Sequence, residues 1–182
     1  MFTKNTSPKI YDPLSIILHW LTALSVLGLF ILGLWMVDLN YYSQWYKPAP
    51  YWHKSVGLCL AGITLFRLFW KIITPHPAIE GKRWEKQAAK IAHGLIYILM
   101  ICIFTSGYLI STADGRSIDV FGWFAVPALG ELFTHQADIA GEIHFYLAWT
   151  LIILAAVHAL AALKHHFINK DNTLKKMLGV KS

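Results

Sequence analysis

The chain has 182 residues, of which 56% are hydrophobic and only 14% are charged, and its formal net charge is +6. Soluble domains carry about 25% charged residues, so this composition argues against an ordinary soluble domain and is typical of a membrane protein. The basic excess lies mainly on one side of the apolar stretches, so we interpret it as a topology signal rather than a nucleic-acid-binding surface.

Four apolar stretches are long enough to cross a bilayer, which takes about 20 residues of helix. They cover residues 14–37, about 51–73, about 88–110 and about 143–163. Because backbone polar groups must be paired inside lipid, each is predicted to be a helix. The first is too long for a signal-peptide core and lacks a small-residue cleavage site, so we expect it to be retained. The expected fold class is an all-α membrane protein, a four-transmembrane-helix bundle forming one domain over residues 1–182.

Lysine and arginine are unequally divided between the two ends of the predicted spans. One side carries three of them: Lys47, Lys54 and Arg116. The other side carries thirteen: Lys4, Lys9, Arg67, Lys71, Lys82, Arg83, Lys86, Lys90, Lys164, Lys170, Lys175, Lys176 and Lys181. The positive-inside rule therefore predicts that both termini are cytoplasmic.

The connection over residues 111–142 is the one long loop between the predicted spans. Its apolar segment VFGWFAVPAL is expected to lie on the membrane face or to cap the bundle. Cys59 and Cys102 fall within spans and are expected to be small core hydrophobes. The sequence has no C-x-x-C-H motif, which excludes covalent attachment of a c-type haem.

Five of the nine histidines lie in predicted spans, where titratable side chains are costly and usually functional. His53 and His144 lie near the outer ends, whereas His19, His93 and His158 lie near the inner ends. The fourteen residues from His144 to His158 rise about 21 Å and return to within about 40° of the same helix face. Imidazoles are therefore predicted at two heights. The other four histidines are expected to be solvated or interfacial: His76, His135, His165 and His166.

Paired imidazoles from different helices, without nearby Cys or carboxylate ligands, suit axial ligation of haem iron. A zinc site would use three or four ligands. His93 has the bulky Tyr97 one turn later, which favours His19 over His93 as the partner of His158. The remaining candidate ligands have small residues one turn later, which leave room for a flat macrocycle: Ala23, Gly57, Ala148 and Ala162. The alternative is that these histidines only bond to neighbours or line a water-filled pore.

Arg67 lies fourteen residues beyond His53, so it shares that helix face at the inner depth. A buried arginine needs an anion, and a haem propionate is a candidate partner. Snorkelling of the side chain to the inner headgroups is the alternative.

Several segments match one known family over essentially the whole chain. They are SIILHW in the first span, WHKSVG in the second, AHGLIYILM in the third, and GEIHFYLAW and VHALAALKHHFINKDNTLKKM in and after the fourth. On these segments the chain resembles bacterial cytochrome b561. It is more distantly similar to the cytochrome b subunits of formate dehydrogenases and nickel-iron hydrogenases.

The resemblance implies two haem b groups with iron ligands from both levels. It makes His53 and His144 the ligands of an outer haem, and His19 and His158 those of an inner haem. His93 matches a family histidine that is not a ligand and lies near a quinone.

The resemblance also implies a multi-pass protein of the bacterial inner membrane that passes electrons between a periplasmic donor and the quinone pool. In one branch of the family the donor is superoxide. Ser15, Arg67 and His93 are the candidate quinone contacts. Two other functions stay open: a membrane anchor that relays electrons for a soluble dehydrogenase, and a haem-free transporter of protons or metal ions.

Overall fold

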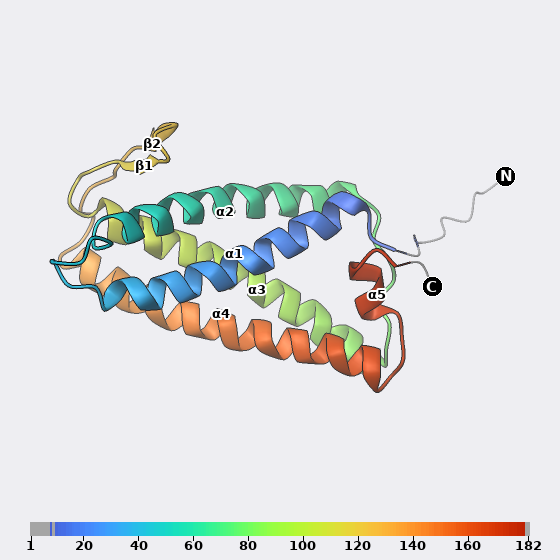
Figure 1. The fold of residues 1–182 in the computed structure, drawn as a ribbon. Coiled ribbons are helices and arrows are strands. Elements are labelled where there is room, and N and C mark those ends of the chain that lie inside the picture. Colours follow the sequence, from blue (N-terminus) through green and yellow to red (C-terminus); the bar gives the residue numbers. More distant parts are fainter. Residues whose placement is uncertain (1–7, 9, 181–182) are drawn as a thin grey trace.

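The computed structural model describes residue 8 and residues 10–180, and it consists mainly of four long helices (Figure 1). The helices are α1 (Pro13–Val37), α2 (Pro48–Ile73), α3 (Arg83–Thr112) and α4 (Gln136–Phe167). Each is long and apolar enough to cross a membrane, so the expected four-helix membrane bundle is confirmed. Lys4, Lys9 and Lys181, which contribute to the charge pattern, lie outside the described residues.

The first two helices begin with residues that suit a helix N-terminus. The Asp12 side chain accepts a hydrogen bond from the Ser15 backbone N–H at 3.0 Å, and Pro13 opens α1. Pro48 occupies the first turn of α2. Proline is tolerated there because the first N–H groups of a helix have no partner within the helix.

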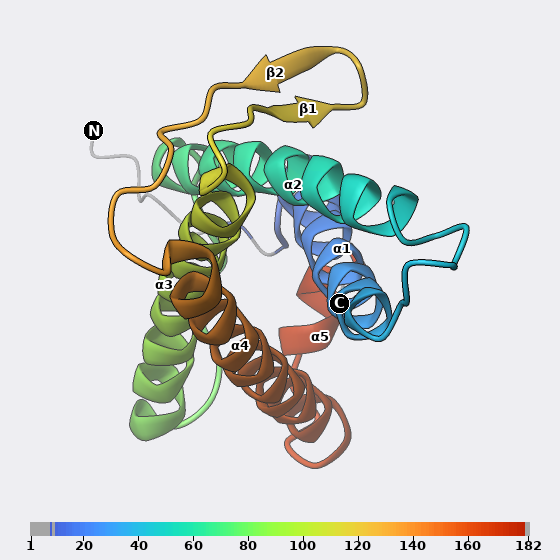
Figure 2. The same cartoon turned by 90° about the vertical axis from the view of Figure 1, so that its left-hand side faces the viewer.

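Successive helices run in alternating directions, so the connections gather at two ends of the bundle. Figure 1 shows the α1–α2 and α3–α4 connections at one end, which we call the hairpin end. The α2–α3 connection, the start of α1 and the end of α4 lie at the other end, which we call the terminal end. Figure 2 looks from the hairpin end along the helices and shows the four arranged around a common axis.

The burial pattern reverses that of a soluble bundle. Large apolar side chains face outward, as Leu24, Ile72 and Val157 do, whereas the buried positions include the small polar residues Thr22 and Thr64. These two hydroxyls donate to the carbonyl four residues earlier in their own helices. An apolar exterior with small hydroxyl residues inside is typical of helices that pack within lipid.

One apolar layer lies midway along the bundle. Leu60, Met100 and Leu151, from α2, α3 and α4, are each at most 5% exposed and pack together. Val26 of α1 packs against the same cluster. The layer separates polar groups toward the hairpin end from those toward the terminal end.

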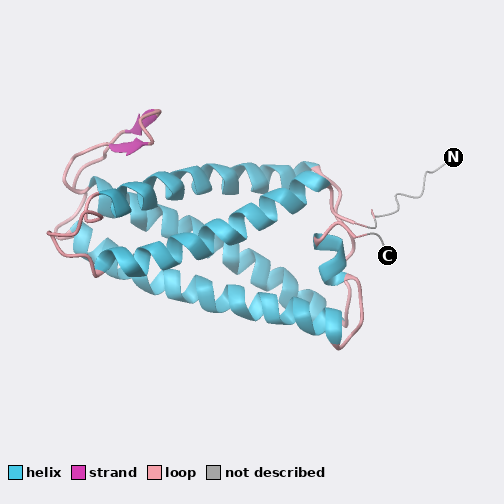
Figure 3. Cartoon of the chain, in the orientation of Figure 1, coloured by secondary structure: helices cyan, strands magenta, loops and turns pink. Residues whose placement is uncertain are grey.

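The long connection at the hairpin end forms a small antiparallel sheet that the sequence analysis did not predict (Figure 3). Strands β1 (Ile118–Val120) and β2 (Phe124–Val126) pair through a turn in which Phe121 and Gly122 have positive φ. Ile118 and Val120 are buried, whereas Trp123 is 76% exposed. Ser55 of α2 donates to the Asp119 carbonyl, so one face of the hairpin packs against α2.

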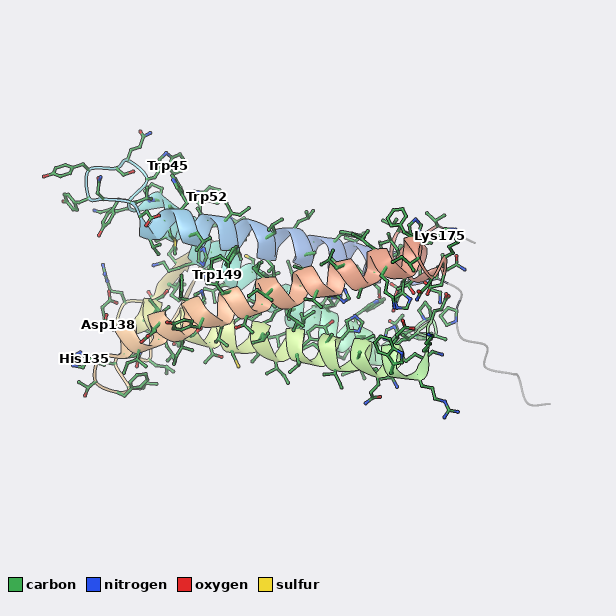
Figure 4. All side chains as sticks on the ribbon, turned by 90° about the horizontal axis from the view of Figure 1, so that it is seen from below. Trp45, Trp52, His135, Asp138, Trp149 and Lys175 are labelled. Carbon is green, nitrogen blue, oxygen red and sulfur yellow. The ribbon has the colours of Figure 1, made fainter. Side chains whose placement is uncertain are left out.

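The two ends also differ in the side chains that they expose. Figure 4 shows Trp45, Trp52 and Trp149 in the half of the molecule at the hairpin end, together with Asp138. It shows Lys175 at the opposite end. Trp lies at both ends, with Trp84 exposed near the terminal end, so the basic residues carry the asymmetry between the two ends.

A short helix, α5 (Thr173–Met177), closes the terminal end across the α2–α3 connection. The Lys176 ammonium pairs with the Glu80 carboxylate and donates to the Ala78 carbonyl. The Trp20 indole N–H donates to the Met177 carbonyl at 3.0 Å. These contacts join the C-terminal segment to α1 and to the α2–α3 connection.

We expect acid to loosen α5. The hydrogen bond from Lys176 holds the pKa of the Glu80 carboxyl below its ordinary value. A lowered carboxyl pKa contributes stability above the unfolded-state pKa, and this contribution is lost as the pH falls through the folded-state pKa. Amide exchange over residues 173–178, corrected for intrinsic rates, should therefore rise a few-fold in acid, because the loss of one ion pair at the end of the bundle costs about 1 kcal/mol. Glu80→Gln should show the faster exchange at neutral pH and little further change on acidification.

Candidate functional site

At three depths in the bundle, each of the four helices directs one residue toward the interior. Along each helix these residues are seven positions apart. Near the hairpin end these positions are Gly33, His53, Gly107 and His144. In the middle they are Val26, Leu60, Met100 and Leu151, which belong to the apolar layer. Near the terminal end they are His19, Arg67, His93 and His158. Seven residues make about two helical turns, so each helix shows one face at three depths.

At the hairpin end, His53 of α2 faces His144 of α4. Their ring centroids are 6.3 Å apart and the ring planes are inclined by 69°. We call these two residues the hairpin-end pair. Both side chains are half-buried, and the His53 Nδ1 atom is buried without a hydrogen-bond partner among the described residues.

Two glycines, which the sequence analysis did not single out, make room for the hairpin-end pair. A Cβ atom on Gly33 of α1 would lie 3.2 Å from the His53 Cε1 atom. A Cβ atom on Gly107 of α3 would lie 3.2 Å from the His144 Cε1 atom. Each imidazole therefore rests against the bare backbone of the helix beside its own, at a separation that a side chain would disturb.

Hydrogen bonds from α3 fix the orientation of His144. Its Nδ1 atom lies 3.1 Å from the Ile103 carbonyl oxygen and 3.0 Å from the Ser106 hydroxyl oxygen. A carbonyl only accepts, so His144 carries its hydrogen on Nδ1 and keeps a free lone pair on Nε2. A metal-ligating imidazole typically has this arrangement.

At the terminal end, His19 of α1 faces His158 of α4 with ring centroids 6.5 Å apart. We call these two residues the terminal-end pair. The guanidinium of Arg67 donates to the His19 Nδ1 atom at 2.9 Å. His93 of α3 also approaches His158, with its ring centroid 5.1 Å away. The structure thus brings all four terminal-end positions together.

Ser15, the remaining predicted residue, lies one turn before His19 on α1 and bonds to the helix cap. Ser15 donates its hydroxyl hydrogen to the Asp12 carboxylate, which also caps α1 and accepts from the Trp70 indole N–H at 3.1 Å. The structure therefore gives Ser15 a partner in the helix cap. Of the histidines outside the two pairs, His76 bonds to the Lys71 carbonyl and His165 pairs with Asp171.

The separation of the imidazoles tests whether an iron porphyrin fits. Two metal–imidazole bonds of about 2 Å, with the half-widths of two rings, place the ring centroids roughly 6.3 Å apart. The observed separations of 6.3 Å and 6.5 Å match this value, whereas the 5.1 Å between His93 and His158 is too short. Residues 8 and 10–180 contain no group of three or more His, Cys, Asp or Glu placed to hold a metal ion. The hairpin-end pair and the terminal-end pair therefore each fit the two axial ligands of a haem iron.

These features define a class of protein: a four-helix membrane bundle with paired imidazoles on both sides of a central apolar layer. Comparison with known proteins agrees with this class. The profile of the family described as prokaryotic cytochrome b561 matches residues 10–180, and the chain belongs to this family. The family implies a b-type haem and electron transfer in a bacterial membrane.

Curated relatives cover nearly the full length of the chain. Cytochrome b561 homolog 2 of Escherichia coli is 48% identical over 97% of this chain and 95% of its own length. The probable superoxide oxidase CybB of Yersinia pestis is 31% identical over 93% of this chain and 96% of its own. A probable Ni/Fe-hydrogenase B-type cytochrome subunit of Azotobacter vinelandii is 23% identical over 97% of this chain and 88% of its own.

Proposed function

We propose that this protein carries electrons across the bacterial inner membrane through two b haems, from a periplasmic donor to the quinone pool. The observation that carries the proposal is the pair of matched separations, 6.3 Å at the hairpin end and 6.5 Å at the terminal end. The buried layer of Leu60, Met100 and Leu151 lies between the two pairs. One haem at each level would leave only this apolar layer between the two redox centres.

In this proposal His53 and His144 ligate one haem, and His19 and His158 ligate the other. Each haem, when bound, supplies an iron centre that takes up and releases one electron. The chain holds the imidazoles at fixed height and leaves the macrocycle in an apolar interior. Arg67 has no carboxylate within ion-pair distance in the part of the chain that the structure describes, so a haem propionate is its proposed anionic partner.

The proposed direction across the membrane follows from the two ends of the bundle. Lys82, Lys86 and Lys175 accompany the terminal end, so the positive-inside rule places that end and both termini in the cytoplasm. The hairpin end then faces the periplasm and holds the site nearest the electron donor. The terminal end, with His93 and Arg67, is the proposed place of quinone reduction, and Ser15 remains a candidate contact there.

Superoxide is the proposed donor. The support is the 31% identity to a protein named as a probable superoxide oxidase over nearly the full length of both chains. Two superoxide anions each give up one electron and leave as dioxygen. One quinone takes both electrons with two protons from the cytoplasmic side and becomes quinol. His93 is the proposed group that delivers a proton to the quinone.

The proposal predicts that the purified protein converts a ubiquinone analogue to quinol when superoxide is generated beside it. His93→Ala should retain both haems and slow this conversion about tenfold or more, because a proton donor near the quinone is lost. Quinol is measured by its ultraviolet absorption, with haem content checked in the same sample. An unchanged rate in His93→Ala would remove His93 from the quinone site, and no quinol formation by the wild type would reject superoxide as donor.

A second function is favoured by the similarity to a hydrogenase cytochrome subunit over most of both chains. In that case the protein anchors a soluble dehydrogenase and relays its electrons to quinone. The exposed hairpin, with Trp123 projecting outward, would be the docking surface. Recovery of a large periplasmic dehydrogenase with the purified protein, together with haem reduction by that enzyme's substrate, would select this function. A protein purified without haem would instead select the transporter.

A further inference from the structure

The two imidazole pairs differ in the polar groups that touch them. At the hairpin end, the His144 N–H points to two oxygen atoms, the Ile103 carbonyl and the Ser106 hydroxyl. The Ser106 hydroxyl donates its own hydrogen to the Ile103 carbonyl at 3.0 Å, so its oxygen lone pairs are available to the imidazole. Acceptors at the N–H increase electron density at the opposite ring nitrogen and make the imidazole a stronger donor to a metal.

At the terminal end, the contact has the opposite polarity. Arg67, which stays charged at all relevant pH values, lies 2.9 Å from His19 Nδ1. Its guanidinium carbon and the Lys71 ammonium stand 5.7 Å and 5.2 Å from the centre of the same Tyr97 ring. Two cations therefore accompany this level, with Arg67 half-buried and Lys71 more exposed.

Arg67 would give up its hydrogen bond to His19 if that imidazole ligated haem iron, but the charge of the guanidinium would remain at this level. An imidazole that ligates iron keeps its hydrogen on the other ring nitrogen, which then has no lone pair for a guanidinium. Arg67 is anchored on α2 two turns beyond the central apolar layer, so the cation stays at this level. In a medium of low dielectric constant, a nearby cation favours the more negatively charged, reduced state of a redox centre.

A basic residue, Lys54, also lies next to the hairpin-end pair, but among the described residues it forms no hydrogen bond with either imidazole. Lys54 follows His53 in the chain and is close enough to Asp114 to interact with it. The Arg116 guanidinium, and with a smaller effect the Lys54 ammonium, hold the pKa of the Asp114 carboxyl below its ordinary value. Asp114 is already the ion-pair partner of Arg116, so Lys54 differs from Arg67 in making no contact with an imidazole, and not in being neutralised.

We propose that these neighbouring groups set the two haem potentials in opposite directions, an inference that rests on the proposed function. Ser106 and the Ile103 carbonyl lower the potential of the haem at the hairpin end by making His144 a stronger ligand. Arg67, assisted by Lys71, raises the potential of the haem at the terminal end. Electron transfer from the hairpin end to the terminal end is then energetically downhill, toward the quinone. Ser106 is a positioning residue for His144, and Arg67 is the charge that fixes the direction.

Redox titration of the purified holoprotein, followed by absorption, tests this inference. The wild type should titrate as two one-electron components. Ser106→Ala should move the lower component to a more positive potential and leave the higher one in place. Arg67→Gln should move the higher component to a more negative potential and leave the lower one in place. Each variant should reduce the difference between the two haem potentials, Ser106→Ala by raising the lower one and Arg67→Gln by lowering the higher one.

Matched variants separate these effects from general disturbance of the bundle. Ser106→Thr keeps the hydroxyl and should titrate like the wild type. Thr105→Ala removes the adjacent hydroxyl, which is exposed and bonds within α3, and should shift neither component. Should Arg67→Gln lose its haem, Lys71→Gln serves instead and should lower the higher component by a smaller amount.

The inference fails if Ser106→Ala moves the higher component, if Arg67→Gln or Lys71→Gln moves the lower one, or if no variant shifts either. If the wild type holds two haems but the variants show none of these shifts, this inference is wrong and the proposed function still stands. A wild-type protein without haem rejects the proposed function itself.

Discussion

Replacing His53 with alanine is expected to remove the haem of the hairpin end and to leave the other in place. His158→Ala should do the converse. In the proposed assignment each imidazole is one of two protein ligands at its level, and the two pairs lie on opposite sides of a buried apolar layer. Loss of one axial ligand should therefore weaken haem binding at its own level and leave haem binding at the other level unchanged. The pyridine haemochrome content per chain should fall by half in each variant.

His93→Ala is the control for this experiment, because His93 lies at the terminal end but too close to His158 to share an iron with it. That variant should keep both haems. His19→Ala decides between the two candidate partners of His158. If His19→Ala retained the terminal-end haem and His93→Ala lost it, the ligand assignment at that level would be wrong.

Gly107→Leu is expected to dislodge His144 and to release the hairpin-end haem. Even a Cβ atom at this position would lie 3.2 Å from the imidazole, and the longer leucine side chain has to occupy the space of the ring. Displacement would also break the contacts of His144 with Ser106 and Ile103. Gly33→Leu should act in the same way through His53. Haem content should again fall by half, with the terminal-end haem retained.

The chain offers a matched control for each of these glycines. Gly94 lies on α3 and Gly28 on α1, both are exposed, and a Cβ atom on either would meet nothing within 4 Å. Replacing glycine by leucine within a helix raises helix propensity by roughly 0.5–1 kcal/mol. Gly94→Leu and Gly28→Leu should therefore keep both haems and lose no thermal stability. Equal haem loss in all four variants would show that the effect is not specific to the imidazoles.

The membrane bundle could be predicted because its signal is long and repeated. Four apolar stretches of about 20 residues leave few alternatives to four helices. The two levels of histidine could also be predicted, since depth follows from position along a span and facing follows from the fourteen-residue spacing. The structure brings together His53 with His144, and His19 with His158, as these arguments anticipated.

The exact ends of the helices and the two short strands could not be predicted from the sequence. Helix α4 begins at Gln136, seven residues before the apolar stretch, because Gln136 is buried and bonds to the Leu109 and Gly130 carbonyls. The strands β1 and β2 are three residues each and lie in a segment apolar enough to suggest a membrane surface. Their pairing depends on a turn at Phe121 and Gly122 and on packing against α2.

Gly33 and Gly107 share a spacing in the sequence with the histidines. Gly33 lies fourteen residues after His19, and Gly107 lies fourteen residues after His93, the same spacing that links His144 to His158. The spacing therefore indicates that both glycines face the same interior as the imidazoles. Ser106 had no such signal, because its contact with His144 depends on the rotation of α3 against α4, which only the packed structure fixes.

The most direct test of the central claim is the haem content of the purified wild-type protein, measured by pyridine haemochrome against protein mass. Two imidazole pairs at two depths predict two b-type haems per chain, with an absorption spectrum typical of iron ligated by two histidines. A colourless protein, or a single haem per chain in a sample that takes up no more, would contradict it.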